Sequence, residues 1–249
     1  MSGTVARGTG EVRLFGFHHA GGSSSVFQPW RRLLPDGWEL RALDAPGHGT
    51  LMGQRPIDDL DALLAHFLDV VPDEPEVPYA FFGHSMGGIV AYELTRRLVA
   101  EGRVPPVWVG VSACRAPGTP LTAVRHTLDD EGLRRHVAAL GGTPAQLLEN
   151  PALWGIFSPL IRADLRLVET WRSAAGRELR VPLSVFGARE DSAVPTEQLA
   201  AWAGQSAAFL GTRLFDGGHF YFVADPAPLL TEVVRDVRTA LDAAAQRVG

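Results

Sequence analysis

A serine flanked by small residues is the first feature of this chain that could do chemistry. Residues 83–87 read Gly-His-Ser-Met-Gly, with Ser85 at the centre. A nucleophilic serine is often held on a sharp, strained turn between a strand and a helix, where bulkier neighbours would clash. The motif alone is weak because the chain contains 27 glycines. Its context is specific, since residues 79–82 have the composition of a buried strand and residues 86–98 have helical spacing. We therefore expect Ser85 to be a nucleophile.

A histidine near the end of the chain could activate this serine. A serine hydroxyl is a poor nucleophile at neutral pH and needs a base that is oriented by an acid. With a serine on such a turn, the order along the chain is serine, acid, histidine. Only His126, His136 and His219 follow Ser85, and the first two fall in a segment without strands. His219 directly follows the last strand-like run, so we expect it to be the base.

Two neighbouring carboxylates compete for the role of the acid. Glu190 and Asp191 both follow the strand-like run 183–186. Asp216 lies three residues before His219, too close to orient the ring from behind. Asp191 is the stronger candidate by spacing and by the family resemblance given below, and Glu190 is the alternative.

The oxyanion of a tetrahedral intermediate needs backbone N–H donors. One should be the N–H of Met86, the residue after the nucleophile. The second should come from the loop after an early strand, and residues 15–22 fit because their glycines let the backbone approach a substrate closely. From its position we expect the Ala20 N–H to be this donor. His18 and His19 are adjacent on an extended segment, so their side chains diverge and we expect no metal site.

Short apolar runs alternate with segments of helical spacing along most of the chain. The strand-like runs are residues 12–17, 38–43, 79–82, 107–111, 183–186 and 213–215, and helical stripes occur at 57–71, 89–98 and 229–241. This alternation predicts an α/β fold with a mostly parallel central sheet flanked by helices. Ligands of such sheets bind at the carboxyl ends of the strands.

Residues 116–175 interrupt the alternation. They contain only helix-like stretches, at 130–140, 144–148 and 161–171, separated by glycine and proline. A helical insertion between two strands commonly forms a lid over an active site. The alternative is that these helices simply cover one face of the sheet. We expect a single domain over residues 1–249, with a core at 1–115 and 176–249 and a helical lid at about 116–175.

The composition argues against several other functions. The net charge of -5 offers no basic field for nucleic acid. All 23 cationic residues are arginine, which removes Schiff-base chemistry and the phosphate-binding loop that ends in lysine. The single cysteine, Cys114, leaves no cysteine-based zinc site, and we expect it in the core. The start lacks the apolar stretch of an export signal and no membrane span is recognisable. We expect a cytoplasmic monomer that binds neither membrane nor nucleic acid.

Several motifs together resemble one family. Residues 17–22 (Phe-His-His-Ala-Gly-Gly), 82–88 (Phe-Gly-His-Ser-Met-Gly-Gly) and 217–220 (Gly-Gly-His-Phe) are similar to motifs of the type II thioesterases. These are stand-alone α/β-hydrolases that accompany modular polyketide and nonribosomal peptide synthases. Residues 112–117, 140–144 and 159–164 are also similar to the family's motifs, and the resemblance covers roughly residues 12–225.

The resemblance implies an α/β-hydrolase fold and a triad of Ser85, Asp191 and His219, with oxyanion donors at Ala20 and Met86. It implies a serine thioesterase that removes aberrant or stalled acyl groups from the phosphopantetheine arm of an acyl or peptidyl carrier protein. The reaction would pass through an acyl-enzyme on Ser85 and need no metal or other cofactor. A carboxylesterase or lipase-like hydrolase of small esters is the alternative, and a non-catalytic α/β-hydrolase binding protein is a further one.

The chain departs from the family pattern at two positions. The family often has a proline where this chain has His18. It also often has an arginine after Pro-Gly, where this chain has His48. This second stretch is closer to general α/β-hydrolases, so it bears on substrate preference more than on mechanism.

Overall fold

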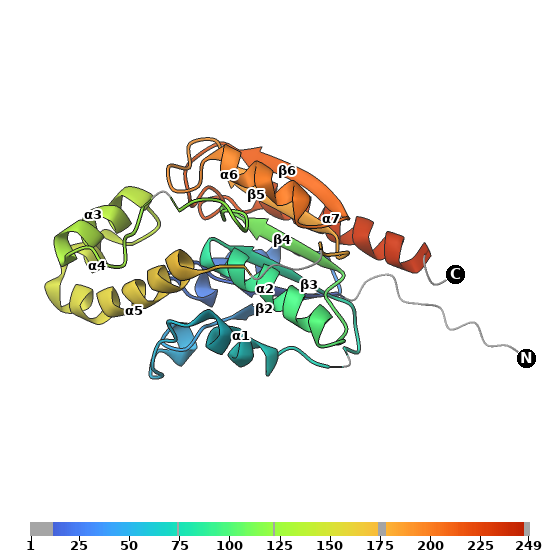
Figure 1. The fold of residues 1–249 in the computed structure, drawn as a ribbon, viewed down its shortest axis with the longest axis horizontal. Helices are drawn as coiled ribbons and strands as arrows, with labels where there is room; N and C mark the ends of the chain where they lie inside the picture. The colour runs from blue at the N-terminus through green and yellow to red at the C-terminus, as the bar shows by residue number, and fades with distance from the viewer. Residues whose placement is uncertain (1–11, 74, 122, 174–177, 247–249) are drawn as a thin grey trace, which may run out of the picture.

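A parallel, six-stranded sheet forms the centre of the molecule in the computed structural model, which describes residues 12–246 except 74, 122 and 174–177. The strands lie in the order β2-β1-β3-β4-β5-β6, and each neighbouring pair is parallel (Figure 1). They are β1 (Val12–Phe17), β2 (Trp38–Leu43), β3 (Tyr79–His84), β4 (Trp108–Ser112), β5 (Leu183–Ala188) and β6 (Phe209–Phe215). Each strand-like run of the sequence coincides with or overlaps a strand, so the predicted fold class is confirmed.

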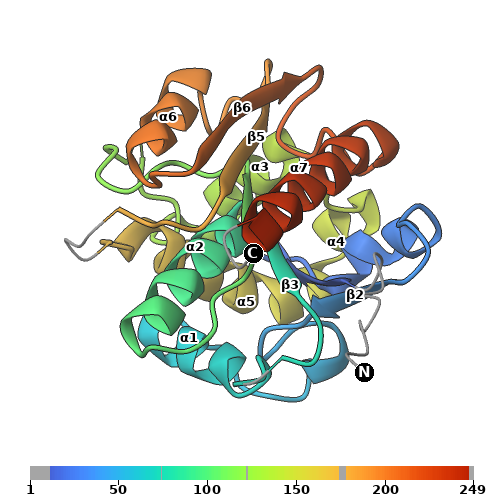
Figure 2. The same ribbon diagram turned by 90° about the vertical axis from the view of Figure 1, so that its right-hand side faces the viewer.

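Two layers of helices cover the sheet. Helices α1 (Leu60–Leu68) and α2 (Met86–Ala100) pack on one face, and their apolar side chains join Phe15, Phe17 and Phe81 in one cluster. The 3₁₀ helix η1 (Ser24–Arg32) and helix α7 (Ala227–Gln246) cover the other face, around Phe82 and Trp108 (Figure 2). Strands β3, β4 and β5 are buried along their whole length, which explains their continuous apolar sequences.

The chain between β4 and β5 forms a separate helical group. It contains α3 (Asp130–Leu140), α4 (Ala145–Glu149) and α5 (Pro151–Thr170), which lie at the opposite end of the molecule from the last turns of α7 (Figure 1). The group has its own small apolar cluster around Leu133, Val137 and Trp154. We call α3, α4 and α5 the helical insertion.

Helix α5 differs from the sequence prediction, which began it at residue 161. It begins at Pro151, where Asn150 caps the helix by accepting hydrogen bonds from two backbone N–H groups. Pro159 is one of the prolines expected to separate the helix-like stretches, but it lies inside the helix. A proline removes one backbone donor and leaves a carbonyl unpaired. Because Pro159 and Gly155 are on the exposed side of α5, water can solvate that carbonyl.

The remaining elements are short. They are η2 (Gly49–Leu51), α6 (Thr196–Ala200) and η3 (Ala201–Gly204). No helix in the described part of the chain is long and apolar enough to cross a membrane.

Candidate active site

Ser85 lies on a strained turn between β3 and α2. Its φ is 56° and its ψ is -116°, a conformation that non-glycine residues rarely adopt. A Cβ at Gly83 would overlap the carbonyl of Gly87, and a Cβ at Gly87 would overlap the carbonyl of Phe17. The Ser85 N–H donates to the carbonyl of Ser112 at 2.8 Å, which ties the turn to the end of β4. The small residues of the motif are therefore required by close backbone contacts.

His219 and Asp191 form a buried pair at the ends of two adjacent strands. Asp191 follows β5, His219 follows β6, and each is 6% exposed. His219 Nδ1 lies 2.8 Å from Asp191 Oδ2. Glu190, the alternative acid, instead accepts a hydrogen bond from the Gly217 N–H at 2.6 Å. The structure brings Asp191 rather than Glu190 to the base candidate.

The other candidates do not take part in this pair. His126 pairs with Glu169 of α5, and His136 of α3 is half-buried and lines the cavity that also contains Ser85 and His219. Asp216 is exposed and pairs with Arg189.

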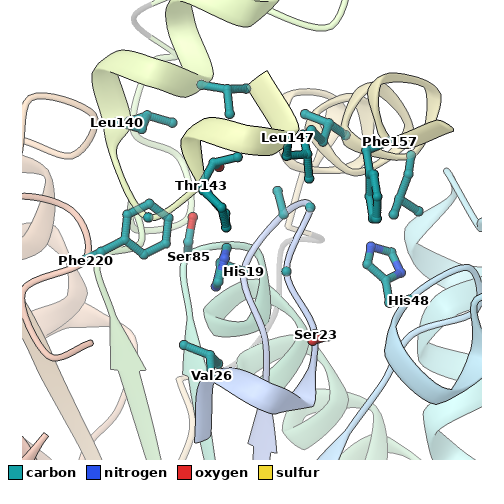
Figure 3. A pocket seen from close by; sticks show the side chains of 18 of the residues that line it. His19, Ser23, Val26, His48, Ser85, Leu140, Thr143, Leu147, Phe157 and Phe220 are labelled. Atoms are coloured by element: carbon teal, nitrogen blue, oxygen red, sulfur yellow. The ribbon is translucent and has the colours of Figure 1, made fainter. Parts of the chain in front are cut away.

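Ser85 and His219 face the same cavity, which has a volume of about 480 Å³. Its floor is the carboxyl edge of the sheet and its roof is the helical insertion. Figure 3 shows Leu140, Thr143 and Leu147 of the insertion on the side of the cavity opposite His19. Within the described residues the Ser85 hydroxyl makes no hydrogen bond to His219; such catalytic contacts commonly tighten only when substrate binds.

The two expected oxyanion donors border this site. Met86 is the first residue of α2, so its N–H is among the first N–H groups of the helix, which have no acceptor within the helix. Ala20 lies in the turn after β1 and lines the cavity. Its N–H donates no hydrogen bond within the part of the chain that the structure describes. Strands β1 and β3 are neighbours, which brings the Ala20 turn next to Ser85.

Buried neutral histidines surround the pair. Burial, together with the charges of His219 and His19, lowers the pKa of His84 well below its ordinary value. Burial and neighbouring histidines lower the pKa of His19 to about 3. His84 Nδ1 lies 2.9 Å from the hydroxyl of Ser112, which lies 2.8 Å from that of Tyr221. Both rings are uncharged at neutral pH, so neither places a cation beside the imidazolium that His219 would form.

Cys114 is a buried residue below this site. Burial, offset only in part by Arg115, raises the pKa of its thiol to about 12, so the thiol stays protonated. Within the described residues, no group of three or more His, Cys, Asp or Glu side chains could hold a metal ion.

A second buried histidine–aspartate pair is not evident from the sequence. His48 Nε2 lies 2.8 Å from Asp164 Oδ2, which joins the loop after β2 to α5. His48 lies below Phe157, at the other end of the cavity from Phe220 (Figure 3). The signals were present separately, because His48 is a departure from the family pattern and Asp164 ends the motif at residues 159–164. Their contact across 116 residues of chain is visible only in the fold.

Comparison with known proteins places the chain in a family. The model of the thioesterase domain matches residues 12–241. The gramicidin S biosynthesis protein GrsT of Aneurinibacillus migulanus is 27% identical over 93% of this chain and 91% of the relative. The thioesterase PikA5 of Streptomyces venezuelae is 30% identical over 84% of this chain and 75% of the relative.

A solved structure agrees with these relatives. YbtT, a type II thioesterase from the yersiniabactin NRPS/PKS biosynthetic pathway, superimposes with a TM-score of 0.83 at 30% identity, over 94% of this chain and 96% of that one. The resemblance to type II thioesterases is therefore confirmed. The chain belongs to the thioesterase family and is a thioester hydrolase with the α/β-hydrolase fold.

Proposed function

We propose that this thioester hydrolase removes aberrant or stalled acyl groups from the phosphopantetheine arm of a carrier protein in polyketide or nonribosomal peptide synthesis. The observation that carries the proposal is the 2.8 Å contact between His219 and Asp191 in the cavity that also contains Ser85. The relatives support the choice of substrate, since GrsT acts in gramicidin S biosynthesis and YbtT in an NRPS/PKS pathway. The proposal places the enzyme in the cytoplasm, with the synthase whose carrier it serves.

The geometry supports acyl transfer in two steps. The Ser85 hydroxyl attacks the thioester carbonyl while His219 takes its proton and Asp191 stabilises the imidazolium. The C–S bond then breaks, and His219 returns the proton to the leaving sulfur. Water, deprotonated by His219, attacks the acyl-Ser85 ester. The ester C–O bond then breaks, His219 returns the proton to the Ser85 oxygen, and the free acid leaves. No metal or other cofactor takes part in this scheme.

The backbone donors act on the charge that develops in both steps. The Ala20 and Met86 N–H groups would donate to the oxyanion, each contributing about 3–4 kcal/mol to transition-state stabilisation. A thioester carbonyl is more electrophilic than an ester carbonyl, and a thiolate leaves more readily than an alkoxide. Two preorganised donors and a single base are therefore sufficient for this reaction.

The cavity fits an acyl chain. Its volume of about 480 Å³ is within the range of small-molecule sites. Apolar side chains form much of its wall, including Leu147, Phe157, Leu160 and Ile161 from the helical insertion. In this proposal the insertion is a lid that encloses the acyl group and excludes bulk water.

A comparison of three substrates tests the assignment. We expect acyl-carrier protein to be hydrolysed with a higher kcat/KM than an acyl-cysteamine thioester, and both to be preferred over a p-nitrophenyl ester. Ser85→Ala should abolish turnover of all three. Preference for the oxygen ester would favour a small-ester hydrolase, whereas full activity of Ser85→Ala would refute the mechanism. Lack of any turnover, together with no labelling of Ser85 by a serine-directed phosphonate, would indicate a binding protein.

A further inference from the structure

Three buried polar side chains beside the cavity have none of the catalytic roles above. His18, His48 and Asp164 are each 2% exposed, and they come from the loops after β1 and β2 and from α5. His18 and His48 are the two positions at which the chain departs from the family pattern. Their ring centroids lie 4.6 Å apart. Buried polar groups need hydrogen-bond partners, so the partners show what this cluster holds in place.

His18 fixes the peptide unit that carries the Ala20 N–H. His18 Nε2 accepts a hydrogen bond from the Ala45 N–H at 3.1 Å, so the ring proton is on Nδ1. Nδ1 donates to the carbonyl of His19 at 2.8 Å, and the Gly22 N–H donates to the same carbonyl at 3.0 Å. In a planar trans peptide the N–H points away from the C=O. Two donors on the His19 carbonyl therefore determine where the Ala20 N–H points.

Asp164 fixes the next peptide unit. Its Oδ2 accepts a hydrogen bond from the Gly21 N–H at 2.6 Å and a second from His48 Nε2 at 2.8 Å. His48 Nδ1 lies 3.1 Å from the carbonyl of Pro46, which can only accept. His48 therefore donates from both nitrogens, as an imidazolium does. Burial alone would lower the pKa of His48, but the hydrogen bond and charge of Asp164 raise it above its ordinary value.

The face of α5 that carries Asp164 also packs on the loops. A Cβ at Gly21 would lie 2.9 Å from Ile161 Cγ1, and a Cβ at Gly47 would lie 3.0 Å from Leu160 Cδ1. Residues three and four apart share a helix face, so Leu160 and Ile161 lie on the same face of α5 as Asp164. If α5 moved away, the Gly21 N–H and the His48 imidazolium would both lose Asp164, the acceptor that they share.

We propose that His18, His48 and Asp164 are positioning residues that orient the Ala20 N–H toward the oxyanion, and that His48 and Asp164 do so only while α5 is seated on the loop. The inference rests on the proposed role of the Ala20 N–H as an oxyanion donor. The proposal links the position of the helical insertion to stabilisation of the oxyanion. Helix α5 roofs the cavity and also supplies Asp164, which holds the loop that contains Ala20.

Substitutions of Asp164 test this role. Asp164→Ala removes the acceptor, whereas Asp164→Asn keeps an amide oxygen for the Gly21 N–H. Asp236→Ala is the matched control, because Asp236 is also a buried carboxylate (3% exposed) but binds Ser184 and Arg213 away from the cavity. The readouts are kcat and KM on a small acyl thioester, and the inhibition constant of a trifluoromethyl ketone analogue. This inhibitor forms a tetrahedral adduct that uses the oxyanion donors. All values are normalised to the active sites titrated by a phosphonate.

We expect Asp164→Ala to lower kcat and inhibitor affinity by a similar factor, about ten- to hundred-fold, with little change in KM; loss of one whole oxyanion donor costs about a hundred- to a thousand-fold. Asp164→Asn should retain most of the wild-type kcat and most of the inhibitor affinity. Asp236→Ala should lower Tm but keep kcat and inhibitor affinity per titrated site. If Asp164→Ala behaves as Asp236→Ala does, the proposal is wrong.

A second pair of variants keeps the test decisive if Asp164→Ala does not fold. His18→Asn places an amide N–H near the position of Nδ1, whereas His18→Leu removes the donor to the His19 carbonyl. We expect the asparagine variant to bind the trifluoromethyl ketone more tightly than the leucine variant, and equal affinities would overturn the proposal. Failure here leaves the proposed function intact as long as Ser85→Ala is inactive and the phosphonate labels Ser85 in the wild type.

Discussion

Asp191 makes two kinds of contact through its two carboxylate oxygens. Oδ2 receives the hydrogen bond from His219, and Oδ1 accepts from the backbone N–H groups of Ala193 and Val194. The backbone donors hold the carboxylate still, so the ring that it binds has one orientation and one tautomer, with the proton on Nδ1. His219 Nε2 is then free to accept the proton of the Ser85 hydroxyl. The neighbouring Glu190 has neither contact and instead supports the loop at Gly217.

Replacing Asp191 by asparagine should therefore disable the base without removing it. The amide can present an N–H to His219 Nδ1, which favours the wrong tautomer. We expect kcat on a small thioester to fall by about a thousand- to ten-thousand-fold, in line with the same change in other serine triads. Glu190→Gln is the control and should retain near-wild-type kcat. A comparable loss in both variants would mean that the acid was assigned wrongly.

Individual residues were predictable where the chemistry depends on local chain order. The turn of Ser85 and the loop of His219 follow from their positions after apolar runs, whereas Asp191 was preferred over Glu190 by spacing and by the family resemblance. The pair of His48 and Asp164 did not, because neither residue type nor spacing indicates a contact between a loop and a helix 116 residues apart.

The turn after α3 connects the helical insertion to the base. Gly141 and Gly142 end this helix, and both have a φ of 76°. The ring of Phe220 packs under Gly142, 5.1 Å from the ring of His219 and 4.7 Å from that of His19. Through this contact a change in the insertion can reach His219.

Alanine substitutions at the two glycines separate backbone strain from contact. Each should cost roughly 1–2 kcal/mol of stability, because an L-residue is strained at positive φ. A Cβ at Gly142 would also press on the Phe220 ring, whereas one at Gly141 meets no atom within 4 Å. We expect Gly142→Ala to lower kcat/KM by about ten- to hundred-fold through displacement of the site, and Gly141→Ala to cause a much smaller loss. Equal losses of kcat/KM would show that Phe220 does not transmit the change.

The elements themselves differed in how far the sequence predicted them. The buried strands were recognisable because both faces are apolar, and β1 and β2 begin and end where the pattern indicates. The start of α5 was not, since Pro159 resembles a break and its exposed position cannot be read from the sequence. Helix η1 was missed because it is a 3₁₀ helix with an internal proline, which gives no 3.6-residue stripe.

At the scale of the whole molecule, the parallel sheet collects the functional loops at one edge. The loops after β1, β3, β5 and β6 carry Ala20, Ser85, Asp191 and His219, although these residues span most of the chain. The fold class followed from alternation of strands and helices, and the position of the site followed from the fold class. The shape of the cavity did not, because it depends on how the insertion packs over that edge.

Buried histidines should make the stability of the whole molecule depend on pH. Burial, with neighbouring histidines, lowers the pKa of His18 to about 4 and that of His19 to about 3, from an ordinary 6.5. Between these values and 6.5 the unfolded chain binds more protons than the folded one, so stability falls as the pH decreases below 6.5. His48 affects stability in the opposite direction, because its pKa is raised in the folded state. The pair of His48 and Asp164 stabilises the fold fully below pH 6.5, and this stabilisation is lost as the pH rises through the folded-state pKa of His48.

We predict a maximum of the unfolding free energy near pH 6.5, measured by urea denaturation from about pH 4 to about pH 9. His19→Leu should flatten the decline on the acid side, and His48→Gln should flatten the decline on the alkaline side. Variants with the same slopes as the wild type would show that these rings do not titrate as their burial and partners require.

The central claim, that a carrier-bound acyl group is transferred to Ser85 before water releases it, can be tested by rapid-quench mass spectrometry. The enzyme is mixed with acylated carrier protein, quenched within the first turnovers and digested. We predict an acyl group on the peptide that contains Ser85, in an amount that together with the free acid released matches the free-thiol carrier formed, and no acylated peptide with Ser85→Ala. Acylation of another residue, or release of free acid by Ser85→Ala at the wild-type rate, would contradict the account.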